Sequence, residues 1–387
     1  MYSAPVRSHT RIVARGLTAT RVRQDVDIVA RAGLDLDAFF GEAVESIRRA
    51  VPWDAACVAT HDPGTSLLTS ARKYGHLAEV DSHDLEFGVV EYGTVEPSAF
   101  TELSRAAVPA AGVHVMTHGE VERSHRMASF MQPHFGFGDE ARLIFRDDRN
   151  AWGALALFRG PDDPPFAEDE IDFLASLSGT FAHGVRTGLL AGLGDPTLAP
   201  TSRGPAVAVV DAAGELVRMT PGTEDRLEDL RGGAAGGDPV TPLYALVGAA
   251  RRYARGEVPN PPRSRIRGAS GMWLVLHAAP LVGRDGHVGE VAVTIEEARP
   301  PEIVGLVVAA FGLTPRERDV TQLVLQGEDT RAIASTLHLS AWTVQDHLKS
   351  VFDKAGVRTR QQLVSRVYFD QYVPRMGEAI APAGWFA

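Results

Sequence analysis

Side chains that could contact nucleic acid gather near the C-terminal end of this 387-residue chain. Gln345, Asp346 and Lys349 fall on one side of a predicted helix whose opposite side is apolar. The Gln345 amide offers the bidentate hydrogen bonds that suit adenine, whereas Asp346 can only accept, which favours a cytosine amino group. Lys349, one turn on, is the strongest candidate for a base or phosphate contact. For Asp346, a solvated helix face fits the pattern equally well.

The helices that would position these side chains are marked by local signals. Thr314, Pro315 and Glu317 form the pattern of a capping box with proline at the first helical position. The helix that follows should bury one apolar stripe and stop near Gly327. Three more helices are expected, at about 330–337, from an N-cap at Ser340 to about 355, and at about 360–369.

Two short helices joined by a tight turn, the second with a polar outer face, fit the major groove of double-stranded DNA. The chain carries a net charge of −10, but residues 312–368 hold eight basic and six acidic side chains. An excess of this size matters less than its placement on one face. From periodicity alone, a generic four-helix bundle is the alternative interpretation.

The sequence from Leu313 to Arg360 resembles the DNA-binding domain of LuxR-type regulators, also called GerE- or NarL-type. The resemblance implies a sequence-specific transcriptional regulator that binds pseudo-palindromic double-stranded DNA as a homodimer, with the fourth helix contributing to the dimer contact. The matching residues are Leu313, Thr314, Arg316, Glu317, Gly327, Ile333, Ala334, Leu337, Ser340, Thr343, Val344, His347, Lys354, Val357 and Arg360. The DNA-binding candidates are then Arg331, Ser340, Thr343, Gln345, Asp346, His347, Lys349 and Lys354.

Two places depart from the LuxR-type pattern. Where the family usually has Asn-Lys-Glu at the start of the second helix, this chain has Thr330-Arg331-Ala332, so Arg331 keeps a cation for a phosphate. Where the family usually has a lysine in the third helix, this chain has Gln345. We therefore expect a domain that binds DNA but reads a different sequence. His347 is expected to orient against the backbone, and Trp342 to pack on a neighbour rather than contact DNA.

Two α+β units are expected upstream, followed by the all-α four-helix domain. In the first unit, a helix at 36–51 precedes strands at 55–60 and 67–71, a hairpin of 140–145 with 152–159, and a helix at 169–190. In the second unit, strands at 206–211, 272–278 and 290–295 surround a helical middle that includes 243–254. The predicted domains are a leader 1–30, a first unit 31–191, a linker 192–204, a second unit 205–298, a connector 299–311, a helix-turn-helix domain 312–370 and a tail 371–387.

The upstream units resemble sensory domains. The first is similar to a GAF-type domain in its initial helix, its Trp-Gly-Ala-Leu strand at 152–155 and its long final helix. The second is similar to a PAS-like domain in its Val-Val-Asp start at 209–211 and its strand around 272–278. Together they imply an input module, open to a small-molecule effector, that controls the DNA-binding module, with dimerisation along the helix at 169–190.

Four aromatic residues of the first unit could line a ligand pocket or pack in its core. Their spacing does not decide between the two roles, and core packing is the more usual one for such side chains. These residues are Phe130, Phe135, Phe137 and Trp152.

Residue types that could bind metals or act as nucleophiles are sparse. Four histidines occur close together in the first unit, but no carboxylate or thiolate is placed convincingly near them, so neither a metal nor another cofactor is expected. Cys57 lacks a paired base, which favours a protein that is not an enzyme. The glycine-rich 232–237 segment lacks the lysine of a phosphate-binding loop. The four histidines are His114, His118, His125 and His134.

Composition excludes several further classes of protein. No apolar run approaches the length that crosses a bilayer, and the N-terminus lacks the apolar centre of a secretory signal, so no membrane partner is expected. A single cysteine excludes an internal disulfide and suits a cytoplasmic protein. The alternative function is a ligand-sensing protein-interaction adaptor with weakened DNA binding, which Gln345 and the acidic net charge favour.

Overall fold

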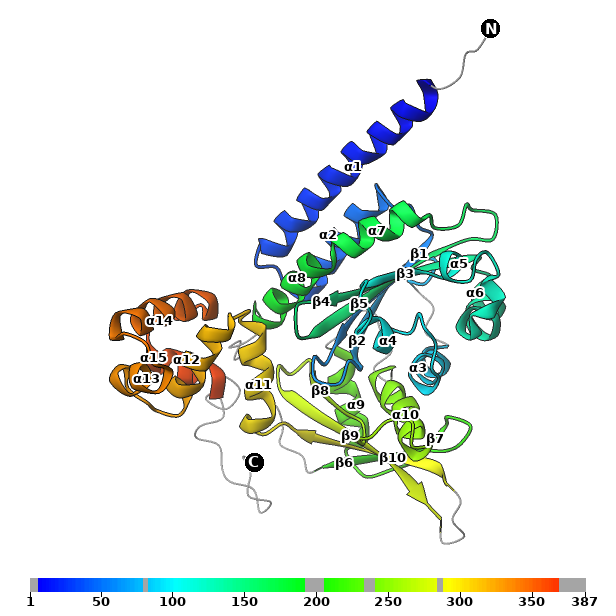
Figure 1. Ribbon diagram of the computed structural model, residues 1–387. Coiled ribbons are helices and arrows are strands. Elements are labelled where there is room, and N and C mark those ends of the chain that lie inside the picture. The colour runs from blue at the N-terminus through cyan, green and yellow to red at the C-terminus, as the bar shows by residue number, and fades with distance from the viewer. Residues whose placement is uncertain (1–5, 79–82, 192–204, 233–240, 284–287, 369–387) are drawn as a thin grey trace.

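The computed structural model describes residues 6–78, 83–191, 205–232, 241–283 and 288–368, which form two α+β units and a four-helix unit (Figure 1). Each α+β unit is built on a five-stranded antiparallel sheet. The predicted architecture of two α+β regions followed by a helical domain is confirmed. The predicted linker 192–204, the tail 371–387 and most of the 232–237 turn lie outside the described residues.

The sheet of the first unit has the strand order β2-β1-β5-β4-β3. The predicted hairpin of β4 and β5 is confirmed, and its pairing begins at Asp139 opposite Arg159. β5 buries every side chain and β4 all but the last, because helices cover both faces of this sheet. The strands are β1 (Ala55–His61), β2 (Leu68–Gly75), β3 (Ala110–Gly112), β4 (Asp139–Arg146) and β5 (Ala151–Arg159).

Two helical layers sandwich this sheet. One face carries an aromatic core around Phe181. The centroid of its ring lies 4.5 Å from that of Phe145 and 5.6 Å from that of Phe39. On the other face, Phe130 packs in a separate apolar cluster. The first layer holds α1 (Val6–Arg31), α2 (Leu36–Arg48), α7 (Glu168–Ser176) and α8 (Ser178–Ala191), and the second holds α3 (Asp84–Gly93), α4 (Phe100–Leu103), α5 (Val113–Met116), η1 (Val121–Arg123), η2 (Met127–Met131) and α6 (Gln132–Phe135).

Two predictions for the first unit need correction. The C-terminal half of α1, which falls in the predicted leader 1–30, belongs to the first unit, because Val22, Val26 and Ala30 are buried in its core. The helix predicted at 169–190 is two helices, and α8 lies against α1 and α2 (Figure 1). A Cβ at Gly184 would fall 2.2 Å from the ring of Phe39, so α2 approaches α8 very closely. This face of α8 is therefore not available for the expected dimer contact.

The sheet of the second unit has the order β7-β6-β10-β9-β8. β8 is not among the predicted strands, although its residues alternate between arginines and the buried Ser264 and Ile266, as a strand requires. The far end of β9 is open to solvent, where Val282 is exposed. The elements are β6 (Ala206–Val210), β7 (Leu216–Met219), α9 (Thr223–Gly232), α10 (Thr241–Ala254), β8 (Arg263–Arg267), β9 (Trp273–Val282) and β10 (Val288–Glu297).

Helix α10 is shared by the two units. Leu243 and Leu246 belong to one apolar core with Leu68 and Ala71 of the first sheet and with strands of the second. α10 crosses α3 at glycines, and a Cβ added at Gly248 would lie 3.0 Å from the Gly88 carbonyl oxygen. The two units are therefore joined by a common core rather than by a loose contact.

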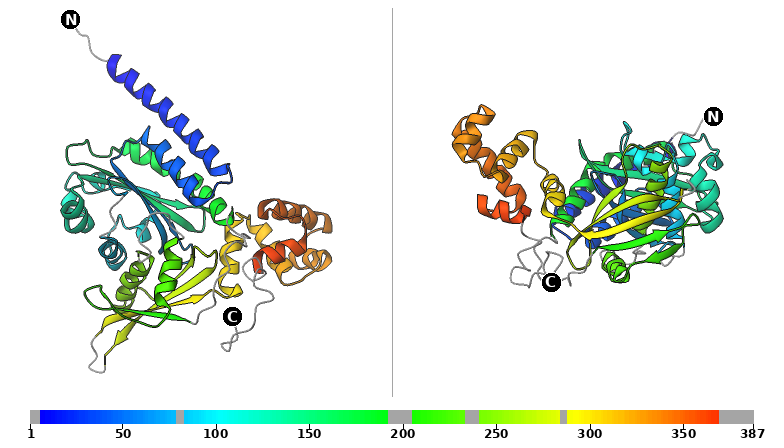
Figure 2. Two further views of the ribbon diagram at one scale, coloured as in Figure 1. Left: turned by 180° about the vertical axis from the view of Figure 1, so that it is seen from behind. Right: turned by 90° about the horizontal axis from the view of Figure 1, so that it is seen from below.

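The predicted connector at 299–311 is largely helix α11 (Pro300–Ala310). Leu306 packs with Trp273 of the second sheet, whereas Val307 and Phe311 belong to the core of the four-helix unit. Figure 2 shows α11 between that unit and the α+β units. Among the described helices, none has the length and apolar character that crossing a membrane requires. The four-helix unit consists of α12 (Pro315–Leu325), α13 (Thr330–Leu337), α14 (Ala341–Ala355) and α15 (Arg360–Tyr368).

Candidate nucleic-acid interface

Helices α13 and α14 form a tight helix-turn-helix at the predicted positions. Asp329 caps α13 by accepting a hydrogen bond from the Ala332 amide at 2.8 Å. Ser340 caps α14 by accepting one from the Thr343 amide at 3.0 Å, and the two hydroxyl oxygens lie 2.8 Å apart. Between the helices, His338 adopts the left-handed conformation with φ of 53°, which few non-glycine residues do. The turn sets the angle between α13 and α14.

The outer side of α14 presents a continuous stripe that we call the reading face: Trp342, Gln345, Asp346 and Lys349. The last three are exposed, in agreement with their predicted placement. Trp342 leaves 77% of its surface exposed, so the expectation that it packs on a neighbour is wrong. Its indole adds a flat apolar ring and an N–H donor at the start of the reading face.

Two other candidates lie beside the reading face. The Gln345 side-chain amide donates to Thr330 Oγ1 at 3.2 Å, which ties α14 to the start of α13. Arg331 is the next residue of α13 and is exposed, whereas His347 is half-buried. Arg331 therefore extends the reading face, whereas His347 is partly covered by the rest of the four-helix unit.

Lys354 has a different position. Its Nζ donates to Glu317 Oε2 at 2.6 Å and so joins α14 to α12. Ser350 Oγ and the Thr314 amide also donate to this carboxylate, at 2.6 and 2.7 Å. Burial acts to raise the pKa of Glu317, but these hydrogen bonds and the Lys354 charge lower it to about 2. Lys354 therefore links α14 to α12 through Glu317, and whether it also contacts DNA stays a prediction.

Exposed charges of both signs lie on α13 and α14. Arg331 and Lys349 are exposed cations, and Asp346 and Asp353 are exposed carboxylates. Attraction to phosphates must therefore depend on where the two cations lie rather than on a net positive field.

The four-helix unit also matches known proteins. Residues 312–367 match the family described as bacterial regulatory proteins, luxR family. Spore germination protein GerE of Bacillus subtilis is 41% identical over 66 residues, which are 17% of this chain and 81% of that protein. The chain belongs to the luxR family of bacterial regulatory proteins. The resemblance stated from the sequence is confirmed for this domain.

Other relatives of this luxR-family chain match the same domain. A helix-turn-helix-type transcriptional regulator of Mycobacterium bovis is 50% identical over 52 residues, so the chain spans only 6% of that protein's length. Among solved structures, a Vibrio cholerae VqmA–ligand–DNA complex covers 46% of this chain and 89% of its own at 17% identity. Its TM-score of 0.24 is below the level that indicates a shared fold.

The four aromatic candidates of the first unit do not form one pocket. Phe130 and Phe135 line a narrow apolar pocket of about 50 Å³ on one face of the sheet. Phe137 packs beside it in the core, with its ring stacked 5.8 Å from that of Phe135. Trp152 lies on the opposite face, where its Nε1 donates to Asp147 at 2.9 Å. The predicted pocket is thus reduced to two residues, and the other two pack in cores.

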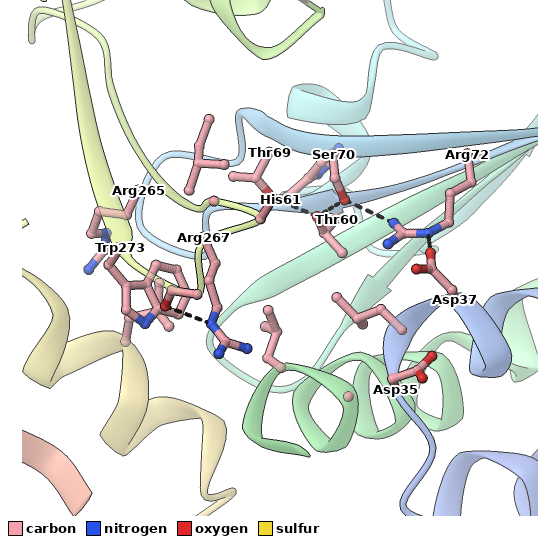
Figure 3. A pocket seen from close by; sticks show the side chains of 18 of the residues that line it. Asp35, Asp37, Thr60, His61, Thr69, Ser70, Arg72, Arg265, Arg267 and Trp273 are labelled. Carbon is pink, nitrogen blue, oxygen red and sulfur yellow. Dashed lines mark hydrogen bonds and ion pairs between the residues drawn. The ribbon is translucent and has the colours of Figure 1, made fainter. Parts of the chain in front are cut away.

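A larger cavity of about 290 Å³ lies where the two α+β units meet (Figure 3). On the first-unit side, the Thr60 hydroxyl lies 2.7 Å from that of Thr69 and 2.6 Å from that of Ser70. Arg72 donates to Ser70 Oγ at 3.0 Å and also to the Asp37 carboxylate. Hydroxyls and a guanidinium therefore line this wall.

The opposite wall comes from the second unit and the connector. Arg267 and Trp273 stand across the cavity from the hydroxyls (Figure 3). Leu189 of α8 and Leu306 of α11 complete the lining. One cavity therefore touches both α+β units and the helix that leads to the helix-turn-helix. No sequence pattern points to it, because its walls come from distant segments.

A salt bridge beside the cavity joins the same three parts. The Arg265 guanidinium pairs with the Asp62 carboxylate at 2.6 Å, and the Arg265 amide donates to the same group at 2.8 Å. Asp62 is 1% exposed. Arg265 also donates to the carbonyl oxygen of Glu302 in α11 at 3.1 Å. A single side chain thus connects the first unit, the second unit and the connector helix.

Proposed function

We propose that this luxR-family protein is a sequence-specific DNA-binding transcriptional regulator that inserts α14 into the major groove. The observation that carries the proposal is the reading face, which is exposed on a capped frame of the family's helix-turn-helix. Lys349 contacts a base or phosphate, Gln345 supplies a bidentate amide, and Arg331 contacts the backbone. Trp342 adds an apolar contact at the groove edge.

The experiment is selection of DNA sites from a random pool with the full chain, followed by affinity measurements at several salt concentrations. We expect an enriched sequence and an affinity that falls steeply with salt, as release of counterions requires. Lys349→Ala should weaken specific binding by about 1–3 kcal/mol. The matched control is Arg316→Ala, which removes an exposed cation from α12. Enrichment of no sequence would refute the proposal.

The proposal includes a homodimer on pseudo-palindromic sites, as the resemblance to LuxR-type regulators implies. Leu363 and Val367 of α15 are buried in the core of the unit, while Val364 is half-buried and offers a partly open side of the same helix. Two chains per palindromic duplex in sedimentation experiments would support this arrangement, and one chain per duplex would contradict it.

The second candidate function is a protein-interaction adaptor with weakened DNA binding. The exposed Asp346 and Asp353 favour it, since carboxylates on α14 oppose contact with phosphates. Under this alternative, affinity for every duplex stays weak, and Asp346→Asn strengthens non-specific binding without selecting a sequence.

We also propose that the upstream units are GAF-like and PAS-like sensory domains that control the helix-turn-helix, without catalytic activity of their own. The interdomain cavity supports this role, because its hydroxyls and arginines suit a small polar effector and its walls include α11. Native mass spectrometry of gently purified protein should detect a bound small molecule that Ser70→Ala releases. If the measured mass equals that of the polypeptide alone, the protein does not carry a tightly bound effector.

A further inference from the structure

Two histidines and a glutamate converge at the edge of the first unit. His83 immediately precedes α3, Glu86 lies in the first turn of α3, and His134 lies in α6. His134 Nε2 is 3.1 Å and His83 Nδ1 3.8 Å from the same carboxylate oxygen of Glu86. One potential ligand atom from each residue lies within 4.8 Å of the others. Three side chains that bind metals therefore meet at one point.

Aromatic rings orient the two imidazoles. The His83 ring meets the Phe135 ring edge-on, with centroids 5.6 Å apart, and the His134 ring lies 5.2 Å from that of Phe130. The imidazole rings themselves are 4.1 Å apart. The three polar side chains remain partly exposed, between 27 and 45%. The cluster is thus held on one side by the core and open on the other to water or a small ligand.

The arrangement offers three ligand atoms to one cation. A divalent cation accepts a lone pair from each neutral imidazole and one from the carboxylate. Two nitrogens and one oxygen, with a position left open, suit zinc and its first-row neighbours. We infer that His83, Glu86 and His134 bind a divalent first-row transition metal ion such as Zn²⁺.

This inference departs from the prediction that no metal is bound. Of the four histidines that are close in sequence, only His134 joins the cluster. His114 lies in α5, where its amide donates to Asp139 at 2.9 Å, and His118 occupies a left-handed turn. His125 is 3.5 Å from Ser129 Oγ. The missing carboxylate and second imidazole come from residues about fifty positions earlier, which spacing could not show.

The bound ion joins α6 to the start of α3, and α3 is the helix that crosses α10. A Cβ added at Gly88 would lie 2.8 Å from Tyr244 Cβ, so the two helices are in close contact only a few residues after Glu86. Metal occupancy therefore orders the part of the first unit that touches the second. The ion is placed to change the stability of the joint between them.

The test uses the full chain, purified without a histidine tag and treated with a chelator. We expect one Zn²⁺ to bind per chain by calorimetry, and one Co²⁺ to give the visible absorption of a site with nitrogen and oxygen ligands. His134→Ala and His83→Ala should each weaken Zn²⁺ binding by more than about 100-fold, since loss of an outer partner alone costs about 10–100-fold. Glu86→Gln should weaken it less.

His125→Ala is the matched control, because it removes a histidine of the same segment from outside the cluster. It should leave the affinity for Zn²⁺ unchanged, and circular dichroism should show that every variant is folded. Hydrogen exchange of residues 83–93 should slow on addition of Zn²⁺ in the wild type only. Equal Zn²⁺ affinities for His134→Ala, His83→Ala and the wild type would overturn the inference.

Discussion

The two α+β units have sheets of the same order when strands are numbered within each unit, but they differ in where they place charge. In the first unit, Glu91, Arg126, Glu140 and Arg142 are all buried against one face of the sheet. The Arg142 guanidinium donates to Glu91 at 2.8 Å and lies over the Phe100 ring. In the second unit, the Arg226–Glu297 pair is largely buried, but Arg218 pairs with Glu290 at the surface, with 65% of the arginine exposed.

This difference follows from how the two sheets are covered. Helices lie on both faces of the first sheet, most of them from its own unit, and α10 of the second unit covers Leu68 and Ala71. This cover excludes water and allows a buried network of charges. The second sheet depends on neighbours, because Ile303 and Leu306 of α11 cover Trp273 and Val275. We interpret the first unit as the larger body, completed by α10 of the second unit, and α11 as the joint that connects both units to the helix-turn-helix.

The largest expected effect comes from breaking the buried network. Glu91→Gln removes the carboxylate that pairs with Arg142 at 2.8 Å and with Arg126 at 3.5 Å in the core, although Glu140 remains beside both arginines. It should lower the free energy of unfolding by about 3 kcal/mol, because a buried charged hydrogen bond is lost. Urea denaturation followed by circular dichroism measures this loss. A change below about 1 kcal/mol would show that the network is solvated and that the contrast between the units is unfounded.

A smaller effect is expected at the helix crossing that joins the units. Gly248→Ala places a methyl group 3.0 Å from the Gly88 carbonyl oxygen and from the Gly93 amide nitrogen, and should destabilise the fold by about 1–3 kcal/mol. Gly305→Ala in α11 is the control, since its Cβ meets nothing within 4 Å. That exposed helical site should gain up to about 1 kcal/mol. Equal stabilisation of both variants would mean that the units do not share a tight contact.

Acidification should distinguish a buried histidine of the first unit from an exposed one of the second. Burial and the nearby Arg142 charge lower the pKa of His61 to about 3. The unfolded chain then takes up the proton first, so stability present at pH 7 falls as the pH drops below about 6.5, by about 2 kcal/mol at pH 5.

Unfolding free energies at pH 7 and pH 5 check this expectation. In His61→Gln, most of the fall in unfolding free energy between pH 7 and pH 5 should disappear. In His277→Gln, on the exposed side of β9, that fall should remain. A wild-type pH dependence that survives in His61→Gln would assign the effect to other groups.

The smallest effect should come from the surface pair of the second unit. Glu290→Gln breaks the contact with Arg218, but the solvated partners should lose less than about 1 kcal/mol, which salt reduces further. Urea denaturation at low and high salt measures it. A loss comparable to that of Glu91→Gln would contradict the distinction between buried and exposed charge.

Local signals predicted the helix-turn-helix almost completely. The capping box of Thr314 and Glu317 is present, Ser340 caps α14, and Gly327 takes a positive φ of 88° after α12. Each of these features involves residues three or four apart, so the sequence displays them directly. The main strands of the two sheets follow from hydrophobic periodicity in the same way.

Contacts between distant segments could not be predicted. The hydrogen bond from Lys354 to Glu317 joins residues that no local pattern relates. The interdomain cavity, the bridge from Asp62 to Arg265 and the cluster around His134 all depend on how the units meet. Trp342 was misplaced for a similar reason, since only the packed frame shows that no neighbour covers it.

The shared helix α10 has a consequence for the order of events during synthesis. Ala59, Leu68 and Ala71 of the first sheet are covered by α10, which begins at Thr241, 170 residues after Ala71. At ribosomal speeds, those strands leave the exit tunnel roughly 10–30 s before their cover does. During this interval the nascent first unit presents an apolar surface to chaperones and to neighbouring chains.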